Sequence, residues 1–153
     1  MKTMKKHIHF LLITLVFATL SGCDIFEVED RSFQDSNVGF ATQSNTLTLE
    51  PSQAGSLSLT VQLIGEQQDQ DLTFNVTTID SATTAQAGSD YSLPNSSVTI
   101  NADSSSAVYT YQVSGQGLSA TQPKTLSLRV EGSGDFESAE LLGRHDLTLI
   151  GTQ

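Results

Sequence analysis

Apolar and polar side chains alternate along most of the chain from Val38 onward. Leucines separated by a single polar residue, Ser or Thr, recur in four short stretches, at residues 46–49, 56–59, 125–128 and 146–149. A period of two places the leucines on one face of an extended strand and hydrogen-bonding groups on the other. Leucine favours helices intrinsically, but the intervening Ser and Thr and the missing 3.6-residue period favour strands here.

The same alternation defines further strands. We expect them at residues 46–49, 57–63, 72–78, 98–100, 108–113, 126–130 and 147–150. Stretches rich in Gly, Pro, Asn and Ser separate them, which indicates turns. Short strands at this spacing predict an all-β fold: an antiparallel two-sheet sandwich of about seven strands. Its large core anchors are expected to be Phe40, Phe74 and Tyr91.

The first 22 residues follow a different pattern. Lys2, Lys5 and Lys6 precede an apolar run at residues 10–20. This run is too short to cross a bilayer as a helix, because a span needs about 20 residues. A basic start, a short apolar run and small residues at its end are typical of a secretory signal segment. Residues 1–22 are therefore predicted to be a signal peptide rather than part of the folded domain.

The end of that segment, Leu20-Ser21-Gly22-Cys23, resembles the lipobox of bacterial lipoproteins, and Cys23 is the only cysteine in the chain. In that family the cysteine sulfur takes a diacylglyceryl group, the chain is cut before the cysteine, and the new amino terminus receives an acyl chain such as palmitate. Two or three chains anchor a protein durably, whereas one chain binds only marginally. The resemblance implies a lipid-anchored protein of the cell envelope, at the outer membrane. The alternative is an ordinary secretory signal with an unrelated cysteine.

Acidic residues dominate the chain that would remain after cleavage. The cut removes three of the seven Lys and Arg and leaves all 17 Asp and Glu, a formal charge of −13. Such a chain is repelled by nucleic acid and by anionic headgroups, so nucleic-acid binding is excluded. Residues 23–37 are expected to carry the lipid and an acidic linker. The acids after the cysteine also resemble signals that place lipoproteins on the cell surface, an alternative to a plain tether.

Four stretches within residues 38–150 resemble the Calx-beta family. They are Val38-Gly-Phe-Ala41, Thr46-Leu-Thr-Leu-Glu50, Ala87-Gly-Ser-Asp-Tyr91 and Ser97-Val-Thr-Ile100. The resemblance implies a seven-stranded sandwich of the immunoglobulin-like kind, common in extracellular and adhesive proteins. We therefore assign residues 38–153 to one Calx-beta-like domain.

That family often binds calcium at one end of the sandwich, and the resemblance carries two ligand positions onto Glu50 and Asp90. The family's later acidic cluster has no match, since residues 114–122 contain no acid. Calcium takes six to eight oxygen ligands, several of them carboxylates. We therefore expect no metal site and no cofactor beyond the lipid on Cys23. Instead, Asp90 is expected to cap its turn through backbone N–H groups, with Tyr91 packed beneath.

Catalytic chemistry is not expected. His145 lacks an evident partner for a triad or a zinc site, and the acidic pairs Asp69/Asp71 and Asp135/Glu137 fit solvated loops. The favoured function is a non-catalytic binding or adhesion module; the alternative is an accessory subunit of an envelope assembly, for example in glycan uptake or secretion. A glycan or an envelope protein is the expected partner. The candidate interaction residues lie in two long polar connections: Ser81, Thr83, Gln86, Gln116, Thr121 and Gln122.

Overall fold

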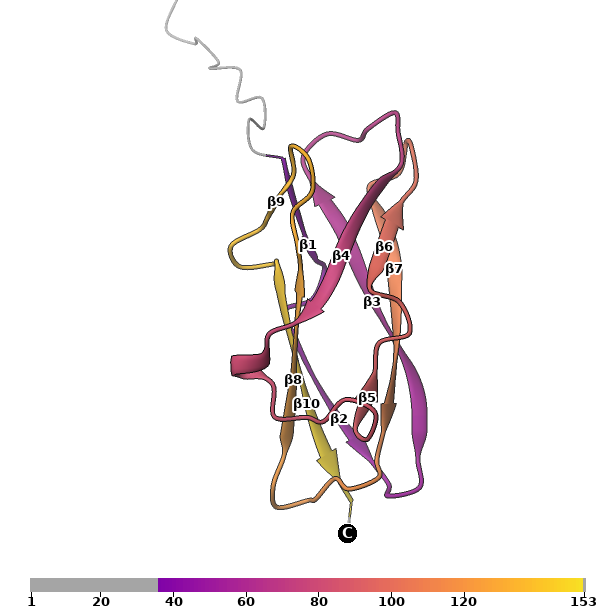
Figure 1. Ribbon diagram of the computed structural model, residues 1–153, viewed down its shortest axis with the longest axis vertical. Coiled ribbons are helices and arrows are strands. Elements are labelled where there is room, and N and C mark those ends of the chain that lie inside the picture. Colours follow the sequence, from indigo (N-terminus) through magenta and orange to yellow (C-terminus); the bar gives the residue numbers. More distant parts are fainter. Residues whose placement is uncertain (1–35, 153) are drawn as a thin grey trace, which may run out of the picture. The chain divides into compact units, whose positions relative to one another are not determined.

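The computed structural model describes residues 36–152, which form a sandwich of two β-sheets (Figure 1). The all-β, two-sheet fold expected from the alternation is confirmed. The predicted signal segment, Cys23 and residues 24–35 of the predicted acidic linker lie outside the described residues. Within the described part of the chain, no helix has the length and apolar character needed to cross a membrane.

Ten strands make up the two sheets. In chain order they are β1 (Asn37–Phe40), β2 (Ser44–Leu49), β3 (Ala54–Ile64), β4 (Leu72–Thr78), β5 (Tyr91–Ser92), β6 (Ser97–Ile100), β7 (Ser106–Ser114), β8 (Lys124–Val130), β9 (Glu137–Ser138) and β10 (Arg144–Gly151). A 3-10 turn, η1 (Asp80–Ala82), follows β4. The seven strands expected from the alternation are present as β2, β3, β4, β6, β7, β8 and β10. The alternation did not predict β1, β5 or β9: β5 and β9 have too few residues to show it, and β1 coincides with the Val38-Gly-Phe-Ala41 stretch that resembles the Calx-beta family.

The first sheet has the order β5-β7-β3-β1-β9 and the second the order β2-β10-β8-β4-β6. Most neighbouring strands run antiparallel, as expected, but two pairs do not. β10 pairs with β2 in parallel, and β1 pairs with β9 in parallel. Parallel neighbours need a long connection between them, and both pairs are far apart in sequence. The prediction of a wholly antiparallel sandwich is therefore corrected at these two positions.

The apolar face of each strand lies between the sheets. On β8, Leu126, Leu128 and Val130 are fully buried, and on β10 the same alternation buries Leu147 and Leu149. The three expected anchors also lie in this core: Phe40 and Phe74 are 0% exposed and Tyr91 is 8% exposed. Most Ser, Thr and charged residues of the strands therefore lie on the outer surface, as the period of two predicts; Lys124, Ser127 and His145 are exceptions.

Two tyrosines that the sequence analysis assigned only to a strand are among the largest buried side chains. The rings of Tyr109 and Tyr111 stack with centroids 6.3 Å apart, and the Tyr109 hydroxyl donates a hydrogen bond to the Asn95 carbonyl at 2.6 Å. Burial, together with the nearby Tyr109, raises the pKa of Tyr111 to about 12. β7 therefore contributes aromatic bulk to the centre of the core, while Val108 on its opposite face is 62% exposed.

Candidate functional site

Three connections meet at one end of the sandwich. Figure 1 shows the turn between β2 and β3 and the connection between β7 and β8 at the same end. The Gly115 N–H donates to the Gln53 carbonyl at 2.7 Å, which joins the two. A Cβ at position 115 would collide with the backbone oxygen of Glu50, so this close approach requires glycine. The third connection is the turn at residues 86–91, which contacts them through Asp90.

Asp90 is the central polar residue of this end, and its side chain is fully buried. Its carboxylate accepts two hydrogen bonds from Lys124 Nζ, at 2.9 Å to Oδ1 and 2.8 Å to Oδ2. Oδ2 also accepts the backbone N–H of Gln86 at 2.7 Å. The expected cap of the turn is therefore present, and Tyr91 is buried beside it. Burying a carboxylate is unfavourable unless it is paired and hydrogen-bonded, and here both conditions are met.

Lys124 reaches Asp90 because of its position on β8. Residues 124, 126, 128 and 130 share one face of the strand, and the last three point into the core. Lys124 therefore enters the space between the sheets at the end of the strand, with its side chain 25% exposed. Lysine is almost never buried without a paired charge, so a lysine on the apolar face of a strand indicates a buried acid nearby. Lys124 was therefore predictable from the alternation, although the motif that contains Asp90 does not name it.

The ion pair connects the two sheets. Lys124 begins β8 in the second sheet, whereas Asp90 immediately precedes β5 in the first. The Asp90 carbonyl also accepts the N–H of Ser114 at the end of β7, at 2.8 Å. One residue thus holds the turn, both sheets and the start of the β7–β8 connection in a single arrangement.

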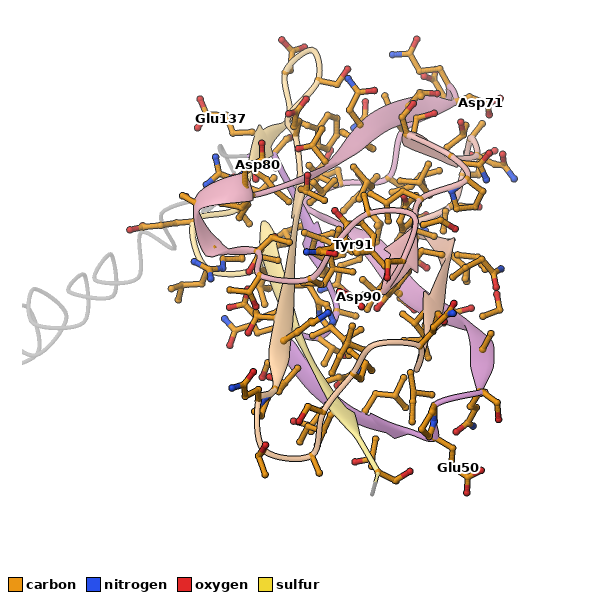
Figure 2. The ribbon with its side chains drawn as sticks, turned by 60° about the horizontal axis from the view of Figure 1, so that its bottom comes forward. Glu50, Asp71, Asp80, Asp90, Tyr91 and Glu137 are labelled. Atoms are coloured by element: carbon orange, nitrogen blue, oxygen red, sulfur yellow. The ribbon has the colours of Figure 1, made fainter. Side chains whose placement is uncertain are left out.

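These residues do not suit a calcium ion. Both Asp90 oxygens already face the Lys124 ammonium, which supplies the positive charge that a metal would bring. Glu50 is exposed at the tip of its turn, and Figure 2 shows it directed away from Asp90. The other acids labelled there, Asp71, Asp80 and Glu137, lie in other parts of the domain. Residues 36–152 contain no group of three or more His, Cys, Asp or Glu placed to hold a metal.

The candidate interaction residues separate into two groups. Gln86, Gln116, Thr121 and Gln122 are exposed in the connections that meet near Asp90. A Cβ at Gly117 would lie 4.0 Å from Asp90 Oδ1, which places the β7–β8 connection directly over the ion pair. Their role in binding stays a prediction.

Ser81 and Thr83 belong to a segment that lies along β8 instead. Thr84 and Ala85 donate their N–H groups to the Thr125 carbonyl at 2.8 and 3.0 Å, and Ser127 N–H donates to Thr83 Oγ1 at 3.1 Å. Ala85 is also buried, at 8% exposure. Residues 83–85, which the sequence places in a long polar connection, therefore lie against β8 and continue the pairing that β4 begins.

A small hollow lies beside the turn. Its volume is about 150 Å³, and its polar lining residues are Ser89, Ser92, Gln112 and Ser114. Hydroxyl and amide groups supply both donors and acceptors without charge. The hollow therefore offers uncharged polar groups beside the apolar side chains of Ala54, Tyr91 and Val113.

Lys124→Met should destabilise the domain strongly. The substitution leaves the buried Asp90 carboxylate without its counter-charge, which typically costs about 3–5 kcal/mol. Urea denaturation of residues 37–153 measures the loss. Arg129→Met, which removes an exposed arginine from the same strand, is the matched control and should change stability by about 0.5 kcal/mol or less. The double variant Asp90→Asn/Lys124→Met should lose less than the two single losses added together; additive losses would show that the pair is not coupled.

Calcium should leave the melting temperature of residues 37–153 unchanged. A ligand at 100 times its dissociation constant stabilises a protein by about 2.7 kcal/mol, which is several degrees for a domain of this size. Scanning calorimetry in millimolar calcium and in chelator makes the comparison, with magnesium as the control for a general salt effect. A clear upward shift specific to calcium would restore Glu50 and Asp90 as ligands.

The fold has relatives among solved structures. It resembles the apo-form Calx CBD1 domain with a TM-score of 0.62 and 12% sequence identity, covering 78% of this chain and 99% of that one. It also resembles a protein of unknown function from Bacteroides ovatus, with a TM-score of 0.60 and 19% identity over 80% of this chain and 46% of that one. The chain thus spans about half the length of the Bacteroides protein. These identities show the fold alone, a Calx-beta-like β-sandwich.

At the level of sequence, no curated protein matches the chain. A family model described as "Domain of unknown function (DUF4843)" matches residues 33–152, which include every strand of the sandwich. The chain therefore belongs to the family of the domain of unknown function DUF4843.

Proposed function

We propose that this protein is a lipoprotein of the bacterial cell envelope that displays its sandwich as a non-catalytic binding module. The observation that carries the proposal is Leu20-Ser21-Gly22-Cys23, in which the only cysteine of the chain stands where lipid attachment requires it. Acyl chains on Cys23 hold the protein at the outer membrane. The acidic residues that follow keep the domain in solution and away from anionic headgroups.

The binding surface in this proposal is the end of the sandwich near Asp90. Loops on a rigid scaffold are where binding residues concentrate, and the Asp90–Lys124 pair provides that rigidity without a metal. Gln116, Thr121 and Gln122 are exposed there. Uncharged donors and acceptors suit the hydroxyls of a glycan or the polar surface of an envelope protein. The Bacteroides ovatus protein of unknown function shares the fold alone with this chain.

Cys23→Ser tests the anchor. The variant should leave the membrane fraction, or keep its signal segment, because serine has no sulfur to accept the diacylglyceryl group. Detergent-phase partitioning of cell extracts and the mass of the processed chain report the two effects. Ser21→Ala, which keeps a small residue at a neighbouring lipobox position, is the matched control and should behave like the wild type. A Cys23→Ser chain with unchanged partitioning and processing contradicts the anchor.

Replacing residues 120–122 with Gly-Ser-Gly tests the binding surface. Thr121 and Gln122 are exposed and outside the core, so the urea midpoint should stay within error of the wild type. Partners recovered from intact cells with the tethered protein should then bind at least several-fold more weakly. The same replacement at residues 66–68, in the loop before β4, is the control and should leave binding unchanged. If the replacement at residues 66–68 weakens binding and the replacement at residues 120–122 does not, the binding surface lies at the end of the sandwich that contains the β3–β4 loop.

A further inference from the structure

Two arginines lie side by side on the outer face of the second sheet. Arg129 of β8 and Arg144 of β10 are directly paired in the antiparallel register. Both are exposed, because they alternate with buried Leu128, Val130 and His145. Directly opposed residues have their Cβ atoms about 5 Å apart, and like charges in such a pair are destabilising. Two opposed guanidinium groups therefore favour an anion between or above them.

Only one of the two arginines is neutralised within the domain. Arg144 Nε donates to Asp146 Oδ1 at 2.8 Å, and its Nη2 lies 3.4 Å from Ser127 Oγ. Burial raises the pKa of Asp146, but the hydrogen bonds from Arg144 and Ser127 outweigh it, so the net pKa is below the ordinary value and Asp146 is ionised at neutral pH. The Arg129 side chain has no hydrogen bond or ion pair with any described residue. Its donors remain free for a ligand.

The arginines form part of a pocket of about 440 Å³, lined by Arg129, Ser138, Ala139, Glu140, Gly143 and Arg144. The part of the lining that residues 138–143 form is fixed by two hydrogen bonds. The Gly143 N–H donates to the Ala139 carbonyl at 2.7 Å, and Ser138 Oγ donates to the Val130 carbonyl at 2.7 Å. A Cβ at position 143 would collide with this part of the lining, so the loop packs closely onto the strands. The pocket is therefore formed before any ligand arrives.

The lining selects the chemistry of the ligand. Guanidinium groups match carboxylate oxygens in a planar, two-point arrangement. The Glu140 carboxylate accepts hydrogen bonds, which suits hydroxyl groups and opposes a bare anion. The only apolar side chain in the lining is Ala139, so a hydrophobic peptide side chain would bury little area. The volume lies within the range of small-molecule sites and exceeds the needs of a single carboxylate.

We propose that this pocket binds the carboxylate of an acidic saccharide, with Arg129 and Arg144 on the carboxylate and Glu140 on the hydroxyls. Residues 36–152 contain twelve Asp and Glu against three Lys and Arg, and two of those three cations line this pocket. The site is distinct from the end near Asp90: Lys124 and Arg129 are five residues apart on β8, roughly 17 Å, and point to opposite faces. It stands apart from the lipid anchor and from the proposed loop surface.

Binding of glucuronate to the full chain in detergent micelles tests the proposal. Glucuronate should shift the backbone amide resonances of Ala139 and Gly143 in a saturable way at concentrations up to about 50 mM, which covers weak affinities. Glucose lacks the carboxylate and acetate lacks the hydroxyls, so each should bind several-fold more weakly. Arg129→Gln should weaken glucuronate binding about tenfold, the value of one charge-assisted hydrogen bond. The affinity of Arg129→Lys for glucuronate should lie between those of the wild type and Arg129→Gln.

Ser105→Asp is the matched control, since it also lowers the net charge by one but lies outside the pocket. It should bind glucuronate within about twofold of the wild type, as a screened distant charge allows. An unchanged urea midpoint for Arg129→Gln confirms that the variant folds. Any of three results would overturn the proposal. Glucuronate could cause no saturable shift, glucose or acetate could bind as well as glucuronate, or the Arg129→Gln chain could bind glucuronate like the wild type. Glu140→Gln should weaken the binding of glucuronate more than the binding of acetate. A variant that weakens acetate binding more than glucuronate binding would also overturn the proposal.

Discussion

A carboxylate in a protein interior must be compensated, and this requirement determines how one end of the sandwich is arranged. Asp90 is fully buried, so a cation and backbone donors have to meet it. Lys124 supplies the charge from the second sheet, and Gln86 supplies an N–H from the turn. Because these partners come from different sheets and connections, satisfying one side chain fixes the spacing of the layers there. The exposed residues of that end are held in place as a consequence.

Sequence periodicity was sufficient for most of the fold. The Leu-x-Leu stretches placed the strands and their buried faces because alternation reflects one-sided burial directly. The pattern could not place β5 and β9, which contain two residues each, or the two parallel pairings. Pairing partners are chosen by long-range packing, which leaves no local trace in the chain. The segment that contains Ser81 and Thr83 has no alternation for a similar reason: it pairs with β8 partly through the Thr83 and Thr84 hydroxyls.

The candidate site residues also differ in whether the local sequence could predict them. Glu50 and Asp90 follow from resemblance to a family motif, but the sequence could not show that Glu50 is exposed and that Asp90 is paired. Lys124 was predictable in principle, since it interrupts an apolar face. The Arg129–Arg144 pair was not, because it arises only from the register of β8 with β10. A local motif thus finds residues, whereas the register decides which of them share a surface.

The position of β10 bears on how the domain is made. β10 lies between β2 and β8, and β2 has no other neighbour in its sheet. The ribosome releases the chain from its amino terminus, so β2 is synthesised long before its partner, which lies about 100 residues further on. Closing so long a segment is entropically unfavourable until the final contacts form. The sandwich is therefore completed only after β10 has been synthesised, which links acquisition of the native state to the end of synthesis and leaves interrupted chains open to proteolytic quality control.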